Sequence, residues 1–99
     1  MKLIDEMIEH LEEEIEGARE YAERYVECKA RGNMTRANKY KEMASDELKH
    51  AEYVRDFALA DVESLSHVYS MREEEKEKWD KAMRSAHEHM ALTKHMLLM

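Results

Sequence analysis

Residues 7–33 read MIEHLEEEIEGAREYAERYVECKARGN, and this stretch decides the fold class. Its apolar and small side chains recur at alternating steps of four and three residues, the period of one face of an α-helix. Those positions are Met7, Leu11, Ala18, Tyr21 and Tyr25, and Glu14 stands among them. Gly32 and Asn33 then give a turn signal. The sequence therefore predicts a helix from about residue 3 to residue 30.

A second apolar face of the same period follows the turn. It comprises Tyr40, Met43, Val54 and Phe57, with Glu47 and His50 at positions of the same face. Asn33 or Thr35 can cap the start of this helix. Its end is poorly marked, because three residues can each cap a further helix: Asp61, Ser64 and Ser66. We expect the break between residues 58 and 66, with one continuous or kinked helix as the alternative.

A third helical face runs almost to the last residue. Its members are Trp79, Met83, Ala86, Met90 and Leu97, with Thr93 as a polar interruption. The charged run 72–78 is expected to form a solvated face. Pro is absent, Gly occurs twice, and strong helix formers dominate. The fold class is therefore all-α: one domain over residues 1–99, with an antiparallel helix pair in 1–60 and a third helix in 61–99.

Composition and charge argue against several functional classes. The net charge of −7 comes without a basic face, so no nucleic-acid partner is expected. Cys28 is the single cysteine, which excludes an intramolecular disulfide framework and a Cys-x-x-Cys metal centre. The first residues turn polar too soon for a signal peptide, and no apolar run has membrane-spanning length. We therefore expect a cytoplasmic protein without a membrane partner.

Glu14, Glu47 and His50 stand at positions where a helical protein normally places apolar side chains. Burying a carboxylate is costly unless a positive charge compensates it. Glu47 and His50 are three residues apart, so they share one helix face and can bind the same ion. An antiparallel pair turning near Gly32 brings Glu14 level with them. Each residue alone is more often water-exposed or hydrogen-bonded, but the three together favour a metal site.

These residues resemble the helix signatures of rubrerythrin-type ferritin-like proteins. Glu14 and Tyr21, with the small residues Gly17 and Ala18 between them, are similar to the first-helix signature. Residues 42–51, EMASDELKHA, are similar to the second, where a Glu-x-x-His-Ala segment carries metal ligands. The resemblance covers roughly residues 10–57. It implies that Glu14, Glu47 and His50 are the metal ligands.

The resemblance is to half of a complete site, because a ferritin-like centre takes ligands from four helices. The third helix offers no second Glu-x-x-His. Two copies of the chain would complete a four-helix bundle with four carboxylates and two imidazoles, as in the half-length encapsulated ferritins. We therefore expect a homodimer or higher oligomer holding two iron ions at each dimer interface, with manganese as another possible metal.

The expected function is oxidation of Fe(II) by oxygen or peroxide, a ferroxidase-type oxidoreductase activity. Glu47 is expected to be the bridging carboxylate. Two alternatives stay open: a metal-free helical assembly protein, and a di-manganese catalase-like enzyme with the same ligands. Glu75 and Glu88 are either outer ligands or solvated residues. A secondary metal patch is a further alternative for His87, His89 and His95.

Overall fold

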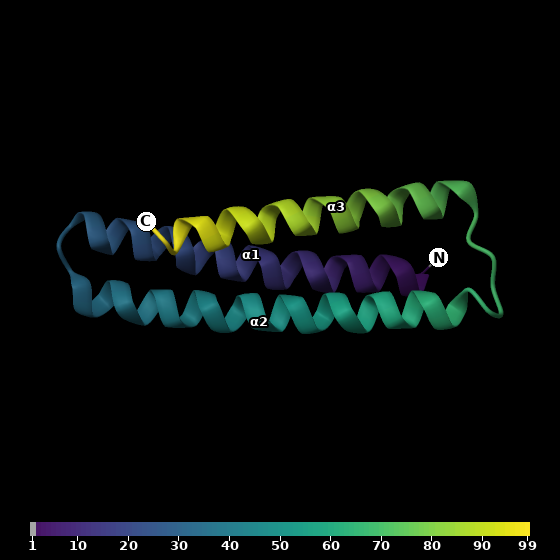
Figure 1. Ribbon diagram of the computed structural model, residues 1–99, viewed down its shortest axis with the longest axis horizontal. Coiled ribbons are helices and arrows are strands. Elements are labelled where there is room, and N and C mark those ends of the chain that lie inside the picture. Colours follow the sequence, from purple (N-terminus) through teal and green to yellow (C-terminus); the bar gives the residue numbers. More distant parts are fainter. Residues whose placement is uncertain (1) are drawn as a thin grey trace.

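The structure is a computed structural model that describes residues 2–99. It contains three helices, α1 (Lys2–Ala30), α2 (Met34–Leu65) and α3 (Glu73–Met96), which run side by side in alternating directions (Figure 1). The molecule measures 54 × 18 × 18 Å. The all-α prediction is confirmed for the described residues. None of their helices combines the length and apolarity needed to cross a bilayer.

The turn between α1 and α2 lies where the sequence predicted it. Gly32 has a φ of +76°, a left-handed conformation that glycine adopts without steric cost. The Asn33 side chain caps α2 by accepting a hydrogen bond from the backbone N–H of Arg36 at 3.1 Å. Because this turn is tight, α1 and α2 form an antiparallel pair along most of their length.

Helix α2 ends at Leu65, at the late end of the break predicted between residues 58 and 66. Asp61 and Ser64, both considered as caps for the third helix, lie within α2, and Ser66 ends α2 instead of starting α3. The connection spans residues 66–72, so the expected division at 60/61 falls inside a helix. The physical reason is that Ala58 and Val62 continue the buried face of α2, which outweighs the isolated capping signals.

The prediction that the whole run 72–78 is a solvated face is wrong at Glu75, which is buried. Only 7% of the Glu75 surface is exposed to solvent. Glu75 Oε1 accepts a hydrogen bond from the Tyr69 hydroxyl at 2.7 Å and from Arg72 Nε at 3.2 Å. The carboxylate is therefore stable in a buried position at the start of α3, where it joins that helix to its preceding connection.

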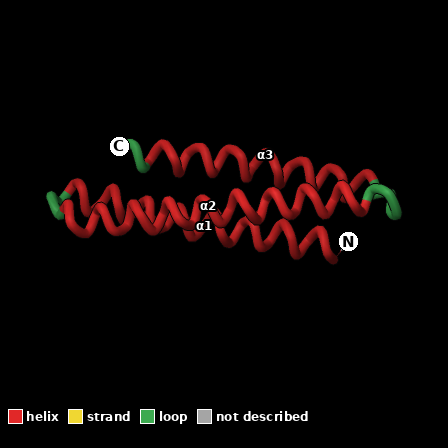
Figure 2. The backbone as a smooth tube through the Cα atoms, turned by 60° about the horizontal axis from the view of Figure 1, so that its bottom comes forward, coloured by secondary structure: helices red, strands yellow, loops and turns green. Residues whose placement is uncertain are grey.

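Helix α1 is the centre of the packing, because both other helices pack against it. Figure 2 shows α3 to one side of the α1–α2 pair. The predicted face of α3 is largely confirmed, with Met83 partly buried and the rest buried: Trp79, Ala86, Met90, Thr93 and Leu97. An ion pair between Lys78 and Asp5 at 2.5 Å also joins α3 to α1. The third helix thus supplies buried side chains to the core.

Candidate metal centre

The structure brings the three predicted ligands together. Glu14 comes from α1, and Glu47 and His50 come from adjacent turns of α2. One potential ligand atom from each lies within 4.8 Å of the others. His50 Nδ1 lies 3.6 Å from Glu47 Oε1 and 4.0 Å from Glu14 Oε2. Among residues 2–99, this is the one such group of at least three acidic, histidine or cysteine side chains.

Small residues let the two helices approach closely at this level. Ala18 of α1 and both Ala44 and Ala51 of α2 are fully buried at the helix interface. Gly17 lies beside Glu47 with no side chain of its own. Helices that meet through such small side chains have short interaxial distances. Side chains at the edge of this interface can therefore reach across it to a common point.

The burial of the three candidate ligands differs from the expectation of a core site. The side chains of Glu14 and Glu47 are 24% and 29% exposed, and that of His50 is 57% exposed. The buried residues of α2 are Ala37, Ala44, Leu48, Ala51 and Ala58, so its core face is displaced by about one residue from the predicted one. Met43 and Phe57, predicted as core, are exposed. The cluster therefore lies at the edge of the α1–α2 interface, open to solvent.

Helix α3 leaves this edge uncovered. Two surface hollows flank the cluster, one beside Gly17 and Glu47 and one beside His10, and residues of α1 and α2 alone line them. On the other edge of α2, Lys94 of α3 forms an ion pair with Glu52 at 2.8 Å. The cluster and α3 thus occupy opposite edges of the same helix pair.

The electrostatics of the cluster favour a cation. Burial raises the pKa of Glu47, and the neighbouring Glu14 carboxylate raises it further. His50 acts in the opposite direction, since its positive form would stabilise the Glu47 carboxylate. Two carboxylates this close repel each other when both are ionised. A bound divalent cation would replace the proton that otherwise relieves this repulsion.

Tyr21 and Tyr40 stack beside the cluster. Their ring centroids are 6.3 Å apart, and the guanidinium of Arg24 lies 5.8 Å from the centroid of Tyr40. Tyr21 lines the same hollow as Glu47. The aromatic pair therefore forms one wall of the approach to the Glu47 carboxylate and holds α1 against α2 at this point.

The other acidic and histidine candidates stay outside the cluster. Glu88, His87, His89 and His95 are exposed on α3, and they form no comparable group among the described residues. Glu75 is engaged by Tyr69 and Arg72. The described residues of α3 thus place no side chain in the cluster.

His10 was not singled out from the sequence. Its Nε2 lies 3.5 Å from Glu14 Oε1, one helical turn before that residue. The signal that could have identified it is the four-residue spacing between His10 and Glu14, which places both on one helix face. Such pairs are common on charged helices, so the spacing gains meaning only from the position of Glu14.

The residues present fit a first-row transition metal. Carboxylate and imidazole donors suit iron and manganese, and helix bundles commonly use them for di-iron and di-manganese centres. Donor atoms bound to one ion at about 2.1 Å lie roughly 3–4 Å from each other, which is the spacing between His50 and the two carboxylates. Comparisons with models of protein families, with curated proteins and with solved structures find no match to this chain.

Proposed function

We propose that Glu14, Glu47 and His50 hold iron and that two copies of the chain complete a di-iron carboxylate centre. The observation that carries this proposal is the approach of two half-buried carboxylates and an imidazole, from two helices, to within 4.8 Å. Carboxylates at partly buried positions are normally accompanied by positive charges or hydrogen-bond donors. The resemblance of residues 10–57 to ferritin-like helix pairs supports the same reading.

The second copy is proposed to dock on the edge that α3 leaves open. Met43 and Phe57 on this edge are 41% and 68% exposed, one on each side of the cluster. A two-fold axis through the cluster would cover both side chains and bring a second set of ligands opposite the first. The two α1–α2 pairs would then form a four-helix bundle around four carboxylates and two imidazoles.

The proposed reaction is ferroxidase chemistry with Fe(II) as the substrate. Two Fe(II) ions supply the two electrons that, with two protons, reduce one hydrogen peroxide to two waters. When dioxygen is the oxidant, two electrons from two Fe(II) ions and two protons reduce it to hydrogen peroxide. The carboxylates of Glu14 and Glu47 balance the added positive charge of Fe(III). His50 is exposed enough to accept an arriving ion without reorganising the helices. A cytoplasmic location is part of the proposal.

A metal-free helical assembly protein is the second candidate function. The exposed side chains of Met43 and Phe57 favour it, because an apolar face of this kind also serves a simple dimer interface. The two candidates share the dimer and differ in the role of the carboxylates.

Anaerobic loading with Fe(II), followed by elemental analysis and light scattering, separates these candidates. If the chain is a di-iron protein, the loaded sample should be a dimer that contains at least one iron per chain. Addition of oxygen or peroxide should then produce an Fe(III) absorbance. Parallel loading with Mn(II) and a catalase assay test the di-manganese alternative. A dimer that binds neither metal would overturn the proposal and support the assembly protein.

A further inference from the structure

Each carboxylate oxygen of Glu14 faces a different histidine. Glu14 Oε1 lies 3.5 Å from His10 Nε2, and Glu14 Oε2 lies 4.0 Å from His50 Nδ1. His10 precedes Glu14 on α1, whereas His50 comes from α2. The two imidazoles therefore approach the carboxylate from separate helices and through separate oxygens.

Both distances fit pairs of donors that share an ion. Ligand atoms bound at about 2.1 Å lie roughly 3–4 Å from each other around one centre. Because the histidines face different oxygens, the arrangement fits two ions bridged by one carboxylate better than one ion bound by both rings. Bridged ions of this kind lie about 3.5–4 Å apart in two-metal sites.

We propose that His10 is a further metal ligand and that Glu14 bridges two divalent ions within one chain. This inference rests on the proposed function. The inner ion is held by Glu14, Glu47 and His50. The outer ion is held by His10 and Glu14, and water completes its coordination. Glu47 keeps its proposed bridging role between the two chains.

The surroundings of His10 suit an outer ion. The His10 side chain is 58% exposed, so its ring loses little hydration when it binds. His10 lines the hollow between α1 and α2 that also contains Phe57 and Asp61. The Asp61 carboxylate adds negative charge there, which attracts cations. The imidazole favours a first-row transition metal over calcium or magnesium, which prefer oxygen donors.

The outer ion has fewer protein ligands than the inner one, and it is therefore expected to bind more weakly. The simpler alternative is that His10 and Glu14 form an ordinary surface pair one turn apart on a helix. That pair would change thermal stability slightly without changing how many ions the chain binds. Metal stoichiometry therefore separates the two readings.

Co(II) is a suitable probe, because its visible absorption reports the number and geometry of its ligands. The full chain is titrated as wild type, His10→Ala, His10→Gln and His50→Ala, with equilibrium dialysis to count ions. His67→Ala is the matched control, since His67 is exposed in the connection between α2 and α3. Circular dichroism verifies that each variant is helical.

Wild type and His67→Ala are expected to bind two Co(II) per chain in two phases. Both His10 variants should lose the weaker phase, or weaken it at least tenfold, while the tighter phase keeps its spectrum. His50→Ala should weaken the tighter phase. Unchanged stoichiometry and affinity in both His10 variants would overturn this inference and leave the proposed function standing. A wild-type protein that binds no Co(II), Fe(II) or Mn(II) would overturn both.

Discussion

Gly17 of α1 lies against the carboxylate of Glu47 of α2. A Cβ atom placed on Gly17 would be 3.4 Å from Glu47 Oε2 and 3.9 Å from its Cδ. An alanine there makes an ordinary van der Waals contact with the carboxylate. A longer side chain has to occupy the space that the carboxylate fills. The residue at position 17 therefore controls where the Glu47 carboxylate can lie.

Substitution of Gly17 tests this relationship. Gly17→Ala should raise the free energy of unfolding by about 0.5–1 kcal/mol, because alanine is the better helix former, and should leave metal affinity unchanged. Gly17→Leu should displace Glu47 and weaken metal binding at least tenfold. Urea unfolding and Co(II) titration measure the two effects. Wild-type affinity in Gly17→Leu would show that Glu47 does not bind the ion from this position.

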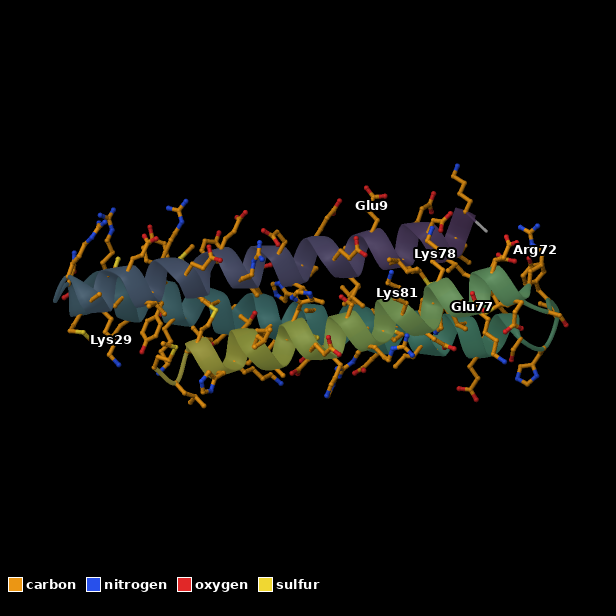
Figure 3. The ribbon with its side chains drawn as sticks, turned by 90° about the horizontal axis from the view of Figure 1, so that it is seen from above. Glu9, Lys29, Arg72, Glu77, Lys78 and Lys81 are labelled. Atoms are coloured by element: carbon orange, nitrogen blue, oxygen red, sulfur yellow. The ribbon has the colours of Figure 1, made fainter. Side chains whose placement is uncertain are left out.

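Glu47→Ala removes one of the two proposed carboxylate ligands. We expect loss of iron binding and of any ferroxidase activity. Glu9→Ala is the control, since Figure 3 shows Glu9 pointing away from the other two helices. Elemental analysis after anaerobic Fe(II) loading compares the two variants with wild type. Full iron occupancy in Glu47→Ala would mean that the proposed ligands are the wrong residues.

The raised pKa of Glu47 predicts how the stability of the metal-free protein depends on pH. A carboxyl group whose pKa is higher in the folded state favours folding when protonated, and this contribution is lost as pH rises through the folded-state pKa. Metal-free Glu47→Gln should therefore melt above wild type at neutral pH, because glutamine stays neutral at every pH. The difference should vanish below the ordinary pKa of Glu. Thermal melts at several pH values check this, and a constant difference would contradict it.

Phe57→Glu tests the proposed dimer interface. Phe57 is 68% exposed, so its replacement should leave the single-chain fold intact while placing a charge in the interface. The expected result is dissociation into monomers. Leu92→Glu is the matched control, because Leu92 is 61% exposed on α3, away from that edge. Light scattering measures the molecular mass of each variant. Dissociation by Leu92→Glu alone would place the interface on α3.

Tyr69→Phe tests the contact that holds the start of α3. The variant loses the hydroxyl that donates to Glu75 Oε1 at 2.7 Å, and the free energy of unfolding should fall. Tyr53→Phe is the control, because Tyr53 is 60% exposed. Urea unfolding measures both. Equal effects of the two substitutions would show that the Tyr69 hydroxyl contributes nothing specific.

The helix pair and the meeting of its three candidate ligands could be predicted from the sequence. Local signals suffice for this: apolar spacing along each helix, and a glycine and an asparagine at one tight turn. The burial of Glu75 could not be predicted, because it depends on a hydroxyl six residues away whose position is set by the connection. The exposure of Met43 and Phe57 was also missed. A periodic face does not reveal which edge of the helix pair a third helix will cover.

The end of α2 and the neighbourhood of His10 show a second limit of sequence patterns. Asp61 and Ser64 are good capping residues, yet they stay inside the helix because Ala58 is buried and Val62 is partly buried against the core. His10 and Glu14 form one of many charged pairs on α1. Only the approach of α2 from the side makes that pair part of a larger group.

Because α3 and the carboxylate cluster lie on opposite edges of the α1–α2 pair, we expect different substitutions to affect thermal stability and the proposed metal binding. Changes at Trp79 or Met90 should alter the melting temperature, while the side chains of the cluster keep their relative positions. Changes at His10, which is exposed on the other edge, should affect the proposed metal binding with little effect on the packed core. Selection can therefore adjust the temperature range of this protein and the chemistry of the edge that carries Glu14, Glu47 and His50 in separate evolutionary steps.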